Sequence, residues 1–124
     1  MRSLREGEIQ LIITMVRGTR LENSIHSIIS DSIVEDMRDG GQGGIHFVRH
    51  RSPGSGWGET ISEVMFSDLD EIPVSVTLNL DREGNLFELD FFKADSSRLL
   101  RYPTPETVTR IPLGAPMIIP PPRG

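Results

Sequence analysis

Apolar residues recur at helical spacing in the first part of the chain. Ser3 and Glu6 have the S-x-x-E spacing of a capping box, in which each side chain satisfies a free backbone N–H, so we expect a helix to begin near Leu4. Gly18 can adopt the left-handed conformation that ends a helix. The predicted buried stripe of this helix consists of Ile9, Ile12, Ile13 and Val16.

A second, weaker helical pattern extends from Leu21 to Ile29. Its apolar stripe consists of Leu21, Ile25, Ile28 and Ile29. His26 falls at the edge of this stripe, where we expect a packed or solvent-facing histidine and not a metal ligand. The first thirty residues therefore predict one strong helix and one weak helix.

From Ile33 onward the chain consists of short β-prone segments separated by glycine, aspartate and proline. We expect strands at residues 33–38, 45–50, 59–66, 73–80 and 86–93. The clearest pair extends from Val74 to Lys93, because apolar and polar residues alternate on both sides of a turn that contains Gly84. Glycine supplies the positive φ that such a hairpin requires.

The return strand of this hairpin has two distinct faces. Phe87, Leu89 and Phe91 share one face, whereas Glu88 and Asp90 share the other, so the sheet should have one dry and one wet side. We expect the helices to cover the dry side. The sequence thus predicts an α+β fold, with an antiparallel sheet of four to five strands packed by one or two N-terminal helices.

Proline marks the last part of the chain. Seven of the nine prolines lie between Pro103 and Pro122, so this segment is expected to be extended and to stay out of the sheet interior. We therefore divide the chain into a single α+β domain, residues 1–102, and a Pro-rich C-terminal tail, residues 103–124.

Composition and charge narrow the classes of function. The 124 residues have a net charge of −5 and include no cysteine, which excludes disulfides, thiolate catalysis and cysteine metal sites. No apolar run approaches the roughly 20 residues that cross a bilayer, and the N-terminal residues show no secretion signal. We expect a cytoplasmic protein with no membrane partner.

Negative charge is concentrated in one part of the chain. The segment from Asp68 to Asp90 contains seven acidic residues and one basic residue, Arg82. The electrostatic field of such a segment repels nucleic acid and attracts cationic surfaces.

The glycine-rich and acidic motifs fit no small-ligand site. Residues 39–44 match neither phosphate-loop signature and lead into a strand, so we expect a mobile or tightly folded β connection. On a strand, His46 and His50 would lie about 13 Å apart, too far for one metal ion. The acidic run at residues 68–71 begins like a calcium loop but lacks its glycine and its final glutamate. We expect no metal and no cofactor.

Two carboxylates and a tryptophan are the candidate contact residues. Glu88 and Asp90 share the wet face of the sheet, where paired carboxylates can share a proton, hold a divalent ion or dock a basic partner. Catalysis by this pair requires an enclosed site, whereas an open face indicates docking. Trp57, the only tryptophan, lies in a glycine-rich stretch, where it can anchor an interface or pack across the end of the sheet.

Four segments together resemble a family of small uncharacterised bacterial proteins. These are Met-Arg-Ser-Leu at 1–4, Gly-Glu-Ile at 7–9, Asp-Gly-Gly-Gln-Gly at 39–43, and the hairpin at 78–95, in which Glu-Leu-Asp precedes two aromatics, lysine, alanine and aspartate. The resemblance covers most of residues 1–101, and the hairpin is its distinctive part. At Phe91, Phe92 and Ser96 the chain departs from the family's pattern. The resemblance implies a shared fold and a bacterial source, and it transfers no active site.

These observations favour a non-enzymatic protein-binding module. Immunity proteins and antitoxins neutralise basic effector enzymes by covering them, and an acidic face would speed such a capture. The predicted contact patch consists of Trp57, Asp68, Asp70, Glu71, Glu88 and Asp90. Two alternatives stay open. One is a small-ligand binder or hydrolase-like enzyme that uses Glu88 and Asp90 with a histidine, His46 or His50, nearby; the other is a structural homo-oligomer in which the C-terminal tail wraps a neighbouring copy.

Overall fold

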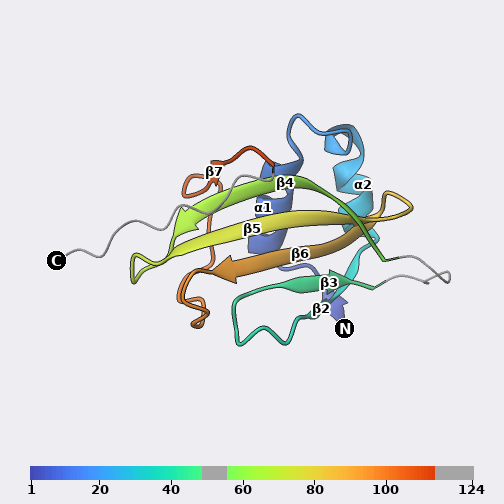
Figure 1. The fold of residues 1–124 in the computed structure, drawn as a ribbon. Helices are drawn as coiled ribbons and strands as arrows, with labels where there is room; N and C mark the ends of the chain where they lie inside the picture. Colours follow the sequence, from blue (N-terminus) through green and yellow to red (C-terminus); the bar gives the residue numbers. More distant parts are fainter. Residues whose placement is uncertain (49–55, 114–124) are drawn as a thin grey trace.

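A computed structural model of the chain describes residues 1–48 and 56–113, and Figure 1 shows their arrangement. The helical elements are α1 (Glu6–Val16), the 3-10 turn η1 (Glu22–Ser24) and α2 (Ile25–Ser30). The strands are β1 (Arg2–Ser3), β2 (Ile33–Asp36), β3 (Ile45–Phe47), β4 (Trp57–Ser67), β5 (Pro73–Asp81), β6 (Leu86–Lys93) and β7 (Thr109–Arg110).

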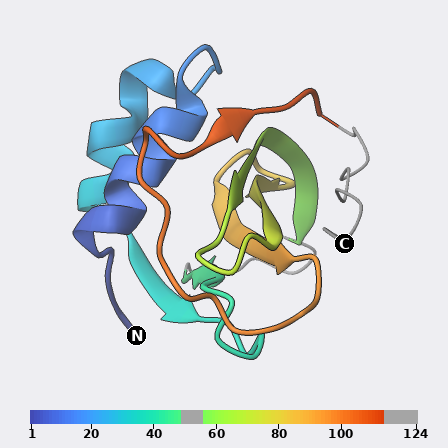
Figure 2. The ribbon, with the colours of Figure 1, turned by 90° about the vertical axis from the view of Figure 1, so that its left-hand side faces the viewer.

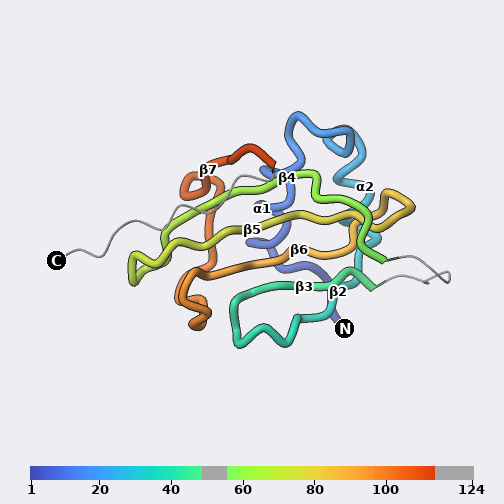
Figure 3. Tube along the Cα trace, in the orientation of Figure 1, coloured from blue at the N-terminus to red at the C-terminus, as the bar shows by residue number. Residues whose placement is uncertain are grey.

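The strands of the described residues form one antiparallel sheet in the order β1-β2-β3-β6-β5-β4-β7. The trace in Figure 3 follows β4, β5 and β6 as two successive hairpins, with β2 and β3 beyond β6. The predicted α+β class, with an antiparallel sheet and N-terminal helices, is confirmed. The predicted number of strands was too low, because β1 and β7 contain only two residues each and so carry no alternating pattern.

Helix α1 begins two residues later than the sequence predicts. Ser3 belongs to β1, so the predicted capping box does not form; instead the Arg5 backbone N donates to Glu8 Oε1 at 2.7 Å. Gly18, with φ of 77°, provides the predicted left-handed stop. The buried residues of the helix are Glu8, Leu11, Ile12, Met15 and Val16, a stripe rotated from the predicted one. No helix among the described residues is long and apolar enough to span a membrane.

The core lies between one face of the sheet and the helices. Figure 2 shows α1, α2 and the segment that joins β6 to β7 on the same side of the sheet. The centre of the sheet contributes Val76 and Leu78 from β5 and Leu89 and Phe91 from β6, all of which are buried. Tyr102, from the joining segment, packs on Phe91 with the ring centroids 5.5 Å apart. This segment therefore completes the core beside the helices.

The chain beyond residue 102 reaches the edge of the sheet. β7 pairs with two residues of β4, and Arg110 Nη2 donates to the carbonyl oxygens of Thr14 and Met15 at the end of α1, at 3.0 and 2.9 Å. A guanidinium at the carboxyl end of a helix also complements the helix dipole. The domain boundary at residue 102 remains a prediction, and residues 114–124 of the predicted tail lie outside the described part of the chain.

Candidate functional site

The side of the sheet opposite the core, called here the outer face, carries most of the polar strand residues. Side chains alternate along a strand, so the burial of Val76 and Leu78 in the core places Thr77 and Asn79 on the outer face. From the register of the strands, the outer face comprises Glu35, His46, Thr60, Glu63, Met65, Ser75, Thr77, Asn79, Glu88, Asp90 and Phe92. Glu88 and Asp90 thus lie on one face, as the alternation predicts.

One row of this face crosses five strands in register. It contains one residue each from β2, β3, β6, β5 and β4, namely Glu35, His46, Glu88, Asn79 and Thr60. Thr60 Oγ1 donates to Asn79 Oδ1 at 2.6 Å, and Asn79 Nδ2 donates to Glu88 Oε1 at 3.2 Å. His46 Nδ1 lies 3.3 Å from Glu88 Oε2, close enough for an ion pair when the imidazole is protonated but without the alignment of a hydrogen bond. The hydrogen bonds among the described residues therefore satisfy this row only in part.

Asp90 lies in the neighbouring row, where it faces Thr77 on β5. Burial raises the pKa of the Asp90 carboxyl, and the negative charges of Glu88 and Asp39 raise it further, while His46 acts in the opposite sense. At the β4 end of this row, Glu63 Oε2 accepts a hydrogen bond from Ser75 Oγ at 2.8 Å. The face thus brings Glu63, Glu88 and Asp90 together, with His46 as the one basic side chain among the face's members. This excess of carboxylates favours a positively charged partner.

The carboxylate pair lies outside four hollows that residues 1–48 and 56–113 form. Four hollows of the described chain have volumes between about 400 and 680 Å³, and neither Glu88 nor Asp90 lines any of these four. No three histidine, aspartate or glutamate side chains of residues 1–48 and 56–113 are grouped so that they could hold a metal ion. The Glu88 side chain is 18 % exposed and neighbouring Asn79 is buried, so the row is recessed in the sheet surface without being enclosed by any of these four hollows. A small-molecule site is normally an enclosed pocket, so this arrangement favours docking.

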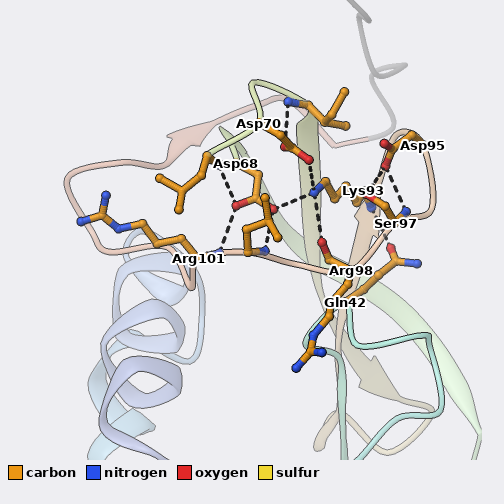
Figure 4. A network of polar contacts seen from close by, with 11 residues as sticks. Gln42, Asp68, Asp70, Lys93, Asp95, Ser97, Arg98 and Arg101 are labelled. Atoms are coloured by element: carbon orange, nitrogen blue, oxygen red, sulfur yellow. Dashed lines mark hydrogen bonds and ion pairs between the residues drawn. The ribbon is translucent and has the colours of Figure 1, made fainter.

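The acids of the β4–β5 turn have a different environment, which the sequence analysis missed. The side chain of Lys93 is completely buried at the end of β6, and its Nζ donates to Asp68 Oδ2 at 2.9 Å and to Asp70 Oδ2 at 2.7 Å. Its third hydrogen bond goes to the carbonyl oxygen of Arg98 at 3.1 Å (Figure 4). All three donors of the ammonium group are thus satisfied inside the protein.

Asp68 is the other centre of this network. Its carboxylate also accepts from the backbone N of Leu69, Leu100 and Arg101, at 2.8, 2.9 and 3.0 Å. Burial acts to raise the pKa of Asp68, but the hydrogen bonds from Leu100 N–H, Lys93 and Leu69 N–H outweigh burial and hold the pKa below its usual value. This carboxylate therefore stays ionised and ties the turn to the segment after β6.

The predicted contact patch is consequently divided. Asp68 is buried and does not lie on an exposed face, and Asp70 is engaged with Lys93. Glu71 is exposed at the same turn, whereas Trp57, 54 % exposed, begins β4 and so lies at the far end of that strand from the turn. Of the six predicted residues, only Glu88 and Asp90 are brought together on the outer face.

One signal in the sequence pointed to the buried pair. Lys93 continues the alternation of Leu89 and Phe91, and Asp68 continues that of Val64 and Phe66, so both fall on the dry face of the sheet. A charged lysine or aspartate in an apolar core is costly unless an opposite charge pairs with it, so two such residues on the dry face are expected to form an ion pair. The sequence separation of 25 residues concealed this pairing.

The Asp-Gly-Gly loop is a tightly folded β connection, one of the two forms predicted for it. Asp39 accepts hydrogen bonds from the backbone N of Gln42 at 3.0 Å and of Gly44 at 2.9 Å. Gln42 Oε1 in turn accepts from the Lys93 backbone N at 2.8 Å, and Leu99 N donates to the carbonyl of Gly41 at 3.1 Å. The loop and the Lys93 network therefore brace each other. His50, the second histidine of the predicted spacing, lies outside the described residues.

Comparison with known proteins identifies the kind of domain but not an activity. A family model for a domain of unknown function matches residues 1–103. No curated protein and no solved structure matches the chain. A function must therefore be inferred from the outer face itself.

Proposed function

We propose that this chain, which belongs to the family described as Domain of unknown function (DUF6984), is a non-enzymatic protein-binding module that docks a basic protein on its outer face. The observation that carries this proposal is the polar row across five strands, whose carboxylates are only partly satisfied by residues 1–48 and 56–113. The described helices and the segment after β6 lie on the other side of the sheet, so none of them covers this row (Figure 2).

The charge of the outer face determines the chemistry of the partner. Four members of this face are acidic, namely Glu35, Glu63, Glu88 and Asp90. His46 is the one basic residue among its members. A surface of this sign steers a cationic protein toward it and repels nucleic acid. Exposed Phe92, at the end of the same face, adds apolar area to the contact.

A basic effector enzyme is the kind of partner that this face fits. An immunity protein or antitoxin needs no catalytic group, because it acts by covering a cationic active-site cleft. Such a role requires a rigid acidic surface and rapid association, both of which an ordered, charged sheet face supplies.

The test is capture of partners from a lysate of the native host, with wild type compared with Glu88→Lys/Asp90→Lys. We expect a basic protein that is retained stoichiometrically by wild type and lost from the charge-reversed variant. The purified partner should then bind wild type with an affinity that falls as the salt concentration rises.

The matched control is Asp31→Lys/Glu106→Lys, which changes the net charge equally at two exposed acids outside the outer face. This control should retain the partner. Equal retention by the wild type and by the outer-face variant would contradict the proposal, as would loss of the partner from the control as well.

A small-ligand binder or hydrolase-like enzyme is the second candidate, and one observation favours it. The raised pKa of Asp90 beside Glu88 is the pattern of a carboxyl pair in which one member holds a proton. Neither carboxylate lines any of the four hollows described above, which speaks against it. Saturable binding of a small molecule that is lost in Glu88→Gln and in Asp90→Asn would favour this candidate over docking.

A further inference from the structure

The end of the sheet at the β4–β5 turn carries exposed apolar side chains next to the buried network. Leu69 is 62 % exposed and Leu100 is 54 % exposed. Their backbone N atoms bind the two oxygens of the same Asp68 carboxylate, at 2.8 and 2.9 Å, so the two leucines are held side by side. Exposed leucines on rigid, hydrogen-bonded backbone indicate a contact surface more than a loose loop.

A hollow of about 470 Å³ opens beside these leucines. Leu99, Leu100 and Tyr102 give it apolar walls, and Arg98 and Arg101 contribute its charges. Figure 4 shows the two guanidinium groups pointing away from the Lys93 network and away from each other. Both arginines are exposed, and no acid of the described residues forms an ion pair with them.

The turn next to the hollow has the complementary composition. Leu69 is followed directly by Asp70, whose side chain pairs with Lys93 and is still 35 % exposed, and by exposed Glu71. An apolar side chain flanked by acids matches a hollow with apolar walls flanked by arginines. Both features lie at the same end of one molecule, and their own geometry keeps them from filling each other, because the turn and residues 98–101 are fixed side by side on Asp68.

We propose that a second copy of this chain docks here, with the β4–β5 turn of each copy seated in the hollow formed by residues 98–101 of the other. Two neighbouring, mutually complementary features are what a two-fold dimer requires, since each contact then occurs twice. The interface leaves the outer face free and is independent of the function proposed above. The buried Lys93 network fixes the backbone of both halves of the contact.

Sedimentation velocity across a wide range of protein concentration tests the proposal. Wild type should pass from one to two chain masses as the concentration rises. Leu100→Asp should weaken dimerisation by about 100-fold or more, because the change places a carboxylate in the apolar contact and does so twice in a two-fold dimer. Leu113→Asp is the matched control. Leu113 is also an exposed leucine, at 55 %, but it does not line the hollow and does not belong to the β4–β5 turn. This control should dimerise like wild type.

The absence of cysteine from the chain permits a second test with assignable cross-links. Leu69→Cys protein mixed with Leu100→Cys protein under mild oxidation should give a disulfide-linked heterodimer in excess of either homodimer, as the crossed contact requires. Leu113→Cys should cross-link only at background.

Three results would overturn the proposal. These are a wild type that stays monomeric at all concentrations, a dimer that Leu100→Asp leaves intact, and cross-links without preference for the 69–100 pair. A monomeric Leu100→Asp variant that still captures the basic partner would separate this interface from the outer face, so failure of either proposal is visible without the other.

Discussion

The two acidic regions of this protein, the β4–β5 turn and the outer face, look alike in sequence and differ in the structure. At the turn, Asp68 is buried and accepts hydrogen bonds from Lys93 and three backbone N–H groups. On the outer face, Glu88 has one hydrogen bond and a poorly aligned histidine, and the pKa of Asp90 is raised.

The difference lies in how completely each carboxylate is satisfied by the protein itself. A buried charge with all its partners stabilises one conformation, and removal of a single partner leaves an uncompensated charge in the core. A half-exposed carboxylate beside like charges contributes little to the fold and keeps its capacity to bind. The first region therefore acts as a structural clasp, and the second is available for function.

Removal of the clasp should give the largest effect. Asp68→Ala leaves Lys93 buried opposite Asp70 alone and frees three backbone N–H groups, so we expect the free energy of unfolding to fall by about 3–5 kcal/mol. Urea unfolding followed by circular dichroism measures this change. Asp95→Ala, at an exposed aspartate that accepts hydrogen bonds from nearby Ser97, should change the free energy of unfolding by less than about 0.5 kcal/mol. A similar loss in both variants would remove the distinction between clasp and surface.

Low pH should weaken the stabilisation that Asp68 gives to the folded state. The pKa of Asp68 is lower in the folded protein than in the unfolded chain, so its stabilisation is complete above the usual aspartate pKa of about 4 and is lost as the pH falls through the folded value. Asp68→Ala should therefore unfold with a weaker dependence on pH below about 4 than wild type. Parallel pH profiles of the two proteins would contradict this assignment.

The Asp-Gly-Gly loop supports the clasp, and its loss should have an intermediate effect. Asp39→Ala removes the acceptors for Gln42 N and Gly44 N and should lower the free energy of unfolding by about 1–2 kcal/mol. Gln42→Ala, which removes the acceptor for the Lys93 backbone N and the donor to the Asp39 carbonyl oxygen, tests the direct link between the loop and the clasp. If neither variant lowered the free energy of unfolding by more than about 0.5 kcal/mol, the proposed bracing would be wrong.

The smallest change in the free energy of unfolding is expected for a substitution on the outer face, and this substitution should stabilise the protein. Because burial and nearby acids raise the pKa of folded Asp90, its ionisation disfavours the folded state at neutral pH. Asp90→Asn should stabilise the protein there by about 0.5 kcal/mol, a figure discounted for solvent screening at this half-buried site. The gain should decline as the pH falls through the raised folded pKa of Asp90 and vanish well below about 4, where Asp90 is protonated in both states. A destabilised variant at neutral pH would place Asp90 among the structural acids.

Local patterns predicted the elements of the fold well where they were long. The strand at residues 86–93 appears with its predicted bounds as β6, because apolar and polar residues alternate from Phe87 to Phe91 and a glycine turn precedes it. The start of α1 was misplaced since Ser3 pairs with β2, a contact between distant residues that no local pattern records. The two-residue strands β1 and β7 escaped prediction for the same reason.

The candidate site was predictable only in part. The outer-face position of Glu88 and Asp90 follows from the period of the strand alone. The burial of Asp68 depends on Lys93, which is remote in sequence, and acids in a turn before proline have the composition of an exposed loop. A charged residue that continues an apolar alternation was the overlooked sign of a buried pair.

The central claim is that the outer face binds while the clasp holds the fold, and calorimetric titration of the captured partner tests it most directly. Glu88→Gln/Asp90→Asn preserves the shape of both side chains and should leave the fold intact. We expect this variant to bind the partner at least about tenfold more weakly than wild type, with a weaker dependence on salt. Unchanged affinity and salt dependence in this well-folded variant would contradict the account.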